Sequence, residues 1–199
     1  MKVYETQKHL YICEMTKEDM RMWLKFLNNF NGKLMFLNET FISSTTLELH
    51  TDAAQSKGYG GIYKSKWFYG AFSDDWKNTN IITLEFYLII VALEMWRSLW
   101  RNQFILFFTD NEALVAVINK QTSQDNRVMK MVRCMVLRCL QNNILFEAKH
   151  IPGKKNVFAD YLSRLQVEQL RQLAPWAQVD PYLVPEKFLP QNFWSTLQY

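Results

Sequence analysis

Four acidic residues are the part of this sequence best suited to chemistry. Asp52 ends the run LHTD and Asp110 ends the run FFTD, and both runs have the apolar character of buried strands. If the two strands are parallel neighbours, both carboxylates leave the sheet at its carboxyl edge, where open α/β sheets place their sites. Capping of the next helix is an alternative explanation for Asp110 but not for Asp52, because no helical pattern follows Asp52.

Glu85 and Asp160 are the two other acids of this kind. Glu85 shares one face of a predicted helix over residues 81–100 with Leu88 and Ile89, and a carboxylate buried there is unfavourable unless it is paired, protonated or bound to metal. Glu94 lies on the opposite face of that helix, where we expect it to be solvated. Asp160 falls in the first turn of a predicted helix over residues 157–165, a position that the helix dipole alone also favours for an acid.

Four carboxylates can share one site only with the help of cations, because like charges a few ångströms apart repel one another or take up protons. Mg²⁺ and Mn²⁺ prefer carboxylate oxygens as ligands. Two such ions, about 3.5–4 Å apart, stabilise the attacking and the leaving oxygen of a phosphodiester. The residues therefore predict metal-dependent hydrolysis of a phosphodiester. The predicted catalytic and metal-binding residues are Asp52, Glu85, Asp110 and Asp160.

The predicted elements that carry these acids follow the order βββαβααβα between residues 46 and 165. Three meandering strands followed by β-α-β units predict an α/β fold, with a five-stranded mixed sheet and helices on both of its faces. Residues 1–45 are predicted to form a helical arm, because apolar residues from Met20 to Leu27 recur at helical spacing. Four of the five prolines lie within residues 175–190, so residues 166–199 are predicted to form an extended tail.

The composition excludes several classes of protein. Of the 199 residues, 49% are apolar and 15% are aromatic, which is too many for a disordered chain. The longest apolar run, residues 86–93, is far shorter than the roughly 20 residues that cross a bilayer, and the first residues contain no apolar signal core. The three cysteines show no C-x-x-C spacing, which argues against a zinc knuckle. We therefore expect an intracellular protein, cytoplasmic or nuclear and not secreted, with no membrane partner.

In four segments the sequence resembles the ribonuclease H domain of retroelement reverse transcriptases, with the DIRS-type and gypsy-type elements as the nearest match. These segments are residues 47–61 (LELHTDAAQSKGYGG), 80–85 (NIITLE), 108–111 (FTDN) and 150–164 (HIPGKKNVFADYLSR). The last is the most specific, because a Pro-Gly turn, an Asn, an Ala-Asp pair and a Leu-Ser-Arg triplet occur in register. The resemblance covers residues 46–165. Residues 22–32 (MWLKFLNNFNG) resemble, more weakly, the segment that joins polymerase to ribonuclease H in DIRS-like elements.

The resemblance implies a ribonuclease H-like fold and endonucleolytic hydrolysis of the RNA strand of RNA–DNA hybrids, leaving a 5′-phosphate and a 3′-hydroxyl. It implies that the four acids are the metal-binding Asp-Glu-Asp-Asp set, with two Mg²⁺ or Mn²⁺ ions as cofactors. The implied partners are an RNA–DNA hybrid and an upstream reverse transcriptase polymerase domain. Gly58, Gly60 and Gly61 would relieve crowding near Asp52 and let the backbone approach the nucleic acid.

One departure from the family concerns the loop before the last acid. Retroviral and cellular relatives carry a His in a longer, mobile loop there, which is thought to help the product leave. Here only Lys154 and Lys155 separate the Pro-Gly turn from Asn156. Either a Lys contacts phosphate in place of the His, or turnover is slower. We interpret His150, which precedes the turn, as a structural residue.

Basic residues gather between residues 120 and 155, where eight Lys and Arg residues are opposed by two acids. Arg127, Lys130 and Arg133 are spaced to line one helix face, which is either a solvated surface or, as we favour, a phosphate-binding one. Discrimination of RNA from DNA would rest on contacts to 2′-hydroxyl groups. The predicted nucleic-acid-binding residues are Gln55, Asn111, Lys120, Arg127, Lys130, Arg133, Lys154, Lys155 and Asn156.

Two other functions are open to a chain of this kind. A non-catalytic, connection-type module keeps the same fold and binds nucleic acid without cutting it, but such a module is expected to have lost carboxylates that are all present here. A DNA-cutting transposase or resolvase of the same fold is expected to space its acids differently and to carry an added DNA-binding domain, and we see none in this sequence.

Overall fold

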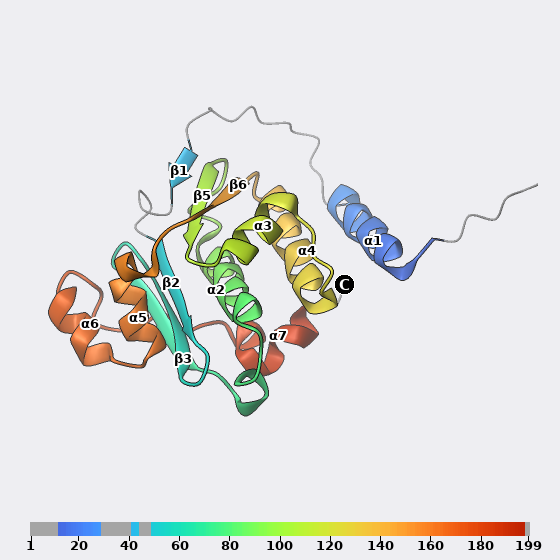
Figure 1. Ribbon diagram of the computed structural model, residues 1–199. Coiled ribbons are helices and arrows are strands. Elements are labelled where there is room, and N and C mark those ends of the chain that lie inside the picture. Colours follow the sequence, from blue (N-terminus) through green and yellow to red (C-terminus); the bar gives the residue numbers. More distant parts are fainter. Residues whose placement is uncertain (1–11, 29–40, 44–48, 198–199) are drawn as a thin grey trace, which may run out of the picture.

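A computed structural model describes residues 12–28, 41–43 and 49–197 (Figure 1). Much of the predicted arm over residues 1–45, and residues 47–48 of the first predicted strand, lie outside the described residues. Within the described part the protein is a mixed α/β structure, as predicted, but its strands are arranged differently from the prediction.

The first three strands after the arm form an antiparallel meander. Strand β2 (Leu49–Ala54) pairs with β3 (Gly58–Tyr63), and β3 pairs with β4 (Lys66–Ala71). Asp52 lies opposite Gly60 in this register. The predicted meander of three strands is confirmed, and the turn between β3 and β4 begins at Lys64, whose φ is +51°.

A second sheet is parallel and has the order β1-β5-β6, with strands β1 (Phe41–Ser43), β5 (Phe104–Thr109) and β6 (Leu145–His150). The prediction of one five-stranded mixed sheet is therefore wrong for the described residues, which form two three-stranded sheets. The reason is that β1 pairs along β5 from Phe104 to Leu106, while β6 takes the other edge of β5. In the described residues no β-ladder joins β2 to β5, although residues of both strands line one cavity.

The helices of this region are α2 (Ile81–Trp96), α3 (Glu112–Lys120), α4 (Asn126–Gln141) and α5 (Val157–Ser163). The predicted helices over residues 81–100 and 157–165 correspond to α2 and α5, and both begin at the predicted residue. Side chains of Asn80, Asn111 and Asp125 accept hydrogen bonds from backbone N–H groups in the first turns of α2, α3 and α4, which explains where these helices start. Helix α2 ends earlier than predicted, at Trp96 rather than at residue 100.

The layers of the molecule follow from the apolar faces of these elements. Helix α5 covers one face of the β2–β4 sheet and α2 covers the other, so the prediction of helices on both faces is confirmed for this sheet (Figure 1). Helix α4 packs on the far side of α2, and α1 (Glu14–Asn28) packs on α4. None of the helices in the described ranges is long and apolar enough to cross a membrane.

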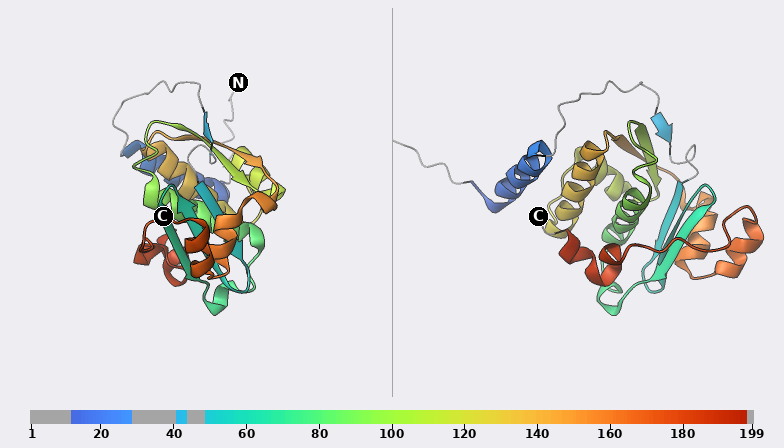
Figure 2. Two further views of the ribbon diagram at one scale, coloured as in Figure 1. Left: turned by 90° about the vertical axis from the view of Figure 1, so that its left-hand side faces the viewer. Right: turned by 180° about the vertical axis from the view of Figure 1, so that it is seen from behind.

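The C-terminal segment is not the extended tail that its prolines predict. It contains α6 (Val167–Leu173), a 3₁₀ turn at Glu186–Phe188 and α7 (Pro190–Thr196). Between the two helices it runs along β4, where the backbone N–H of Gln178 donates to Ser65 O (2.9 Å) and that of Tyr182 donates to Trp67 O (2.7 Å) (Figure 2). Its last turns then bury Phe188, Phe193 and Leu197 in the core. This segment is therefore an integral part of the folded structure.

Close contacts of β3 with α5 and with β4 explain two glycines that the sequence places near Asp52. A Cβ atom built on Gly60 would lie 2.2 Å from Leu162 Cβ, and one built on Gly58 would lie 2.4 Å from Gly70 O. A Cβ on Gly61 would meet the ring of Phe68 at 2.7 Å. These glycines are buried under protein atoms, so the expectation that they let the backbone approach nucleic acid is wrong.

Candidate active site

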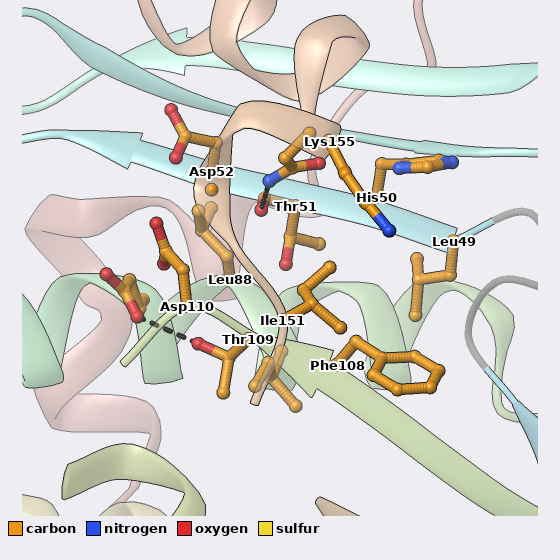
Figure 3. A pocket seen from close by; sticks show the side chains of 14 residues that line it. Leu49, His50, Thr51, Asp52, Leu88, Phe108, Thr109, Asp110, Ile151 and Lys155 are labelled. Atoms are coloured by element: carbon orange, nitrogen blue, oxygen red, sulfur yellow. Dashed lines mark hydrogen bonds between the residues drawn. The ribbon is translucent and has the colours of Figure 1, made fainter. Parts of the chain in front are cut away.

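The predicted acids meet beside the ends of β2 and β5, although Asp52 lies within β2 and not at its last residue, as the sequence had indicated. A cavity of about 280 Å³ lies between these strand ends and the first turns of α2, and Asp52, Glu85 and Asp110 line it. An adjoining cavity is lined by Asp52, Asp110 and Asp160. In Figure 3 the carboxylates of Asp52 and Asp110 lie on the same side of the first cavity. The structure thus brings the four predicted residues together without the strand pairing from which their proximity was argued.

Asp52 is held by the last turn of α5. The hydroxyl of Ser163, which is fully buried, donates a hydrogen bond to Asp52 Oδ2 at 2.5 Å. Burial raises the pKa of the Asp52 carboxyl above its usual value, and the nearby charges of Asp160 and Asp110 act in the same direction. The hydrogen bond from Ser163 acts in the opposite direction, because it favours the ionised form.

Glu85 projects from the first turns of α2 towards the end of β5. Thr109 Oγ1 donates to Glu85 Oε2 at 3.0 Å, and the backbone N–H of Asn111 donates to the same Thr109 hydroxyl oxygen at 3.3 Å. Burial raises the pKa of Glu85 to about 7, with the charge of Asp110 as the next cause. Glu85 is therefore a carboxylate whose charge the folded protein disfavours, as expected of a site that receives cations.

The Pro-Gly segment before α5 packs directly on Asp110. A Cβ atom on Gly153 would lie 2.5 Å from Asp110 Oδ2, so only glycine fits without moving the acid. The segment is anchored on both sides, because Ile151 N donates to Thr109 O at 3.0 Å and Asn156 Nδ2 donates to Thr51 O at 2.7 Å. The amide of Asn156 therefore bridges two parts of the site, which is a structural role beside the predicted contact with nucleic acid.

Asp160 lies at the more open end of the site. Arg164 Nε donates to Asp160 Oδ1 at 2.8 Å, and both side chains are 47% exposed. An exposed pair of this kind contributes little stability and separates readily when a stronger partner arrives. Asp160 is thus accessible from solvent, in contrast to the more enclosed Asp52 and Glu85.

The donor set suits divalent cations in its chemistry. All four side chains offer carboxylate oxygens, and the pKa shifts of Asp52 and Glu85 are caused in part by neighbouring acids of the same set. Among the described residues, no three Asp, Glu, His or Cys side chains are already arranged as ligands of one ion. Small side-chain adjustments within two adjoining cavities would have to complete the coordination.

The lysines of the short turn line different parts of the site. Lys155 lines the cavity with Asp52 and Glu85, but in Figure 3 its side chain extends away from the carboxylates of Asp52 and Asp110. Lys154 lines the adjoining cavity with Asp160. Both lysines are exposed, and His150 is an exposed residue at the end of β6. The roles predicted for Lys154 and Lys155 stay predictions.

Arg133 was predicted to bind nucleic acid, and this prediction is wrong because its side chain is buried and paired. Its side chain is only 4% exposed and lies between α4 and α1. Its guanidinium pairs with Glu18 and with Asp19 (2.8 Å) and donates to Met15 O (3.2 Å). A guanidinium used in this way stabilises the packing of α1 and does not face a phosphate.

The other predicted contact residues are spread over the molecule. Arg127 is exposed at the start of α4, where its guanidinium lies over the ring of Trp194 at 5.7 Å, and Lys130 is half-buried on the same helix. Helix α4 lies on the side of α2 away from β2, so its basic residues do not line the carboxylate cavities (Figure 1).

Of the remaining three contact residues, Gln55 follows β2 and Asn111 follows β5, while Lys120 lies at the far end of α3. Lys120 is exposed in the last turn of α3, and the Gln55 amide donates to Thr79 O at 3.3 Å from the turn after β2. Asn111 caps α3, since its Oδ1 accepts from Leu114 N at 3.1 Å. The structure therefore shows Asn111 as the N-cap of α3, and its contact with nucleic acid stays a prediction.

Sequence reasoning missed several residues that hold the acids. Ser163 and Arg164 follow Asp160 by three and four positions. Residues at this spacing lie on one face of a helix, so the sequence contained a signal for both.

Glu94 was expected to be solvated, but its side chain is 2% exposed and pairs with Arg97 (3.1 Å) and Arg138. The sequence could not show the pair with Arg138, because this residue belongs to α4 and lies 44 residues from Glu94.

Comparison with known proteins adds no family to this description. No protein-family model matches the chain. No curated protein matches it at a significant level of similarity. The assignment of function therefore rests on the residues and on the geometry of the site.

Proposed function

We propose that the protein is the ribonuclease H module of a retrotransposon reverse transcriptase and hydrolyses the RNA strand of RNA–DNA hybrids. The observation that carries the proposal is the meeting of four acids from β2, α2, β5 and α5 around two adjoining cavities. The order of elements and the four matching sequence segments support a ribonuclease H-like fold, with the core strands split into two sheets.

The proposed cofactors are two Mg²⁺ or Mn²⁺ ions. Asp52, Glu85 and Asp110 in the first cavity, with Asp160 in the second, would hold them, and when bound they would supply Lewis-acid stabilisation of the reacting phosphate oxygens. The chain's own contribution is to keep the carboxylates oriented. Thr109 holds Glu85, and the Gly153 turn fixes one side of Asp110.

A non-catalytic, connection-type module is the second candidate. The observation that favours it is that Arg164 Nε donates to Asp160 Oδ1 at 2.8 Å, so one of the four acids already has a cationic partner. This candidate predicts binding of an RNA–DNA hybrid without cleavage.

The proposed protein partner is an upstream polymerase domain. Support comes from α1, where Met20, Trp23 and Leu24 have 56–60% of their surface exposed. Apolar side chains gathered in this way on one helix are typical of a surface that another domain covers. Their position before the catalytic region is the position of the polymerase junction in the resembled family.

A panel of nucleic acids separates the candidate functions. The full chain is incubated with Mg²⁺ and end-labelled RNA–DNA hybrid, duplex DNA, duplex RNA or single-stranded RNA of one sequence. The proposal predicts cutting of the RNA strand of the hybrid alone, with 5′-phosphate and 3′-hydroxyl ends. Hybrid binding without cutting would favour the connection-type module, and cutting of duplex DNA would favour a transposase or resolvase.

A further inference from the structure

Ser163 is a buried polar residue that touches two of the acids. Its side chain is 0% exposed, and its hydroxyl lies 2.5 Å from Asp52 Oδ2 and 3.0 Å from the carbonyl oxygen of Asp160. A hydroxyl has one hydrogen, and a charged acceptor at the shorter distance takes it. Ser163 thus links the strand that carries Asp52 to the helix that carries Asp160.

The position of this hydroxyl is fixed by packing on several sides. Gly60, opposite Asp52 in the sheet, lets α5 approach so closely that an added Cβ would lie 2.2 Å from Leu162 Cβ. A Cβ on Gly58 would lie 3.3 Å from the carbonyl oxygen of Ser163. Because α5 lies in close contact with β3, its packing holds the Ser163 hydroxyl against the Asp52 carboxylate.

We propose that Ser163 is a positioning residue, which orients the Asp52 carboxylate and thereby sets the affinity of the site for divalent cations. The inference rests on the proposed function, since it concerns the same acids. Outer partners that hydrogen-bond a metal-ligating carboxylate restrict its orientation, and their loss weakens metal binding about 10–100-fold. With Oδ2 held by the hydroxyl, Oδ1 is the oxygen of Asp52 that would remain for a cation.

The test measures Mn²⁺ binding to the full chain by calorimetry, without nucleic acid. Ser163→Ala removes the hydroxyl, and Ser163→Cys keeps the size of the side chain but replaces it with a weak donor. Ser73→Ala is the matched control, because the hydroxyl of Ser73 is buried and makes no hydrogen bond in the described structure. Each Ser163 variant is also made in an Asp52→Asn background.

We expect Ser163→Ala to weaken Mn²⁺ binding about tenfold or more, and Ser163→Cys to weaken it less. Ser73→Ala should bind as the wild type does. If Ser163 acts through Asp52, its substitution should change binding less than about twofold in the Asp52→Asn background. Should Ser163→Ala not fold, the Ser163→Cys comparison decides alone.

Two results would overturn the inference: Mn²⁺ affinity unchanged by substitution of Ser163, or an equal loss with and without the Asp52 carboxylate. Absence of Mn²⁺ binding by the wild type would overturn it as well. Hybrid cleavage by the wild type is followed separately in Mg²⁺. A wild type that binds Mn²⁺ but leaves the hybrid intact would refute the proposed function and leave the positioning role to be judged on binding.

Discussion

The folded structure opposes ionisation of the Glu85 carboxyl group. Burial and the charge of Asp110 raise its pKa to about 7, against an ordinary value near 4.5. The folded state therefore keeps a proton on Glu85 that the unfolded chain has already released between these two pH values. The unfolded state binds fewer protons there, so this residue makes the free energy of unfolding decrease as the pH rises from about 4.5 to 7.

Glu85→Gln is expected to stabilise the protein at pH 8 in the absence of divalent ions. The gain is on the order of 1–3 kcal/mol, because the amide removes a charge that the site disfavours. At pH 4.5 the variant and the wild type should have nearly equal free energies of unfolding, since Glu85 is then protonated when folded. Urea unfolding at the two pH values measures the difference. A gain that does not depend on pH would show that burial of the charge is not its cause.

The acids could be predicted at this scale because strand ends and helix faces are visible in the sequence. Asp52, Glu85 and Asp110 line one cavity, as their positions on apolar elements indicated. Arg133 could not be placed correctly, because its partners Glu18 and Asp19 lie more than 110 residues away along the chain. Spacing along a helix shows which residues share a face but not what that face packs against.

Helix α5 is the element that closes the site, and glycines on β3 determine how near it lies. The hydrogen bonds from Ser163 and Arg164 come from its end, and Asp160 comes from its first turn. Its contact with β3 has no space for a methyl group at Gly60. Stability and site geometry are therefore coupled through a single helix–strand contact.

Gly60→Ala is expected to lower the free energy of unfolding by about 1–3 kcal/mol and to reduce hybrid cleavage, because α5 must move away from β3. Gly153→Ala is the matched comparison. Its added Cβ would lie 2.5 Å from the Asp110 carboxylate, so it should disturb the site while changing stability by less than about 0.5 kcal/mol. Thermal and urea unfolding together with cleavage rates separate the two effects. Equal stability of Gly60→Ala and the wild type would contradict the packing argument.

The elements themselves were largely predictable, and their assembly was not. The sequence patterns predicted α2 and α5 close to their observed bounds, and they predicted the meander of three strands that precedes α2. The pairing of β1 with β5 depends on the short strand Phe41–Ser43, which no apolar alternation in the sequence indicated. Which strand occupies an edge is decided by segments far apart in the chain, and periodicity contains no information on that choice.

At the scale of the whole molecule, the C-terminal segment completes the core. Trp76 Nε1 donates to Pro190 O at 3.0 Å, and the hydroxyl of Tyr87 donates to Phe188 O at 2.9 Å. The prediction of an extended tail was wrong because proline is compatible with the start of a helix. Pro190 occupies the first turn of α7, where a backbone N–H group would have no partner within the helix. The region that carries the four acids and the C-terminal segment therefore fold against each other.

Phe193→Ala is expected to destabilise the whole protein by about 3–5 kcal/mol, because the ring is fully buried between Trp76 and Tyr87. Leu183→Ala provides the control. It changes an apolar residue of the same segment that is 88% exposed, and it should shift the free energy of unfolding by less than about 0.5 kcal/mol. Urea unfolding followed by tryptophan fluorescence tests both. Similar stabilities for the two variants would mean that the segment does not contribute to the core.

If the acids of the two cavities catalyse ion-dependent hydrolysis of RNA in a hybrid, cleavage depends both on the ion and on their carboxylates. The most direct measurement is the single-turnover rate of hybrid cleavage, with Mg²⁺ or with a chelator, for the wild type, Asp110→Asn and Asp180→Asn. Asp180 is exposed and lies outside both cavities, so its variant should cleave as the wild type does. We expect cleavage that requires Mg²⁺ and is reduced at least about 100-fold in Asp110→Asn. Cleavage that persists in the chelator, or that is the same in both variants, would contradict it.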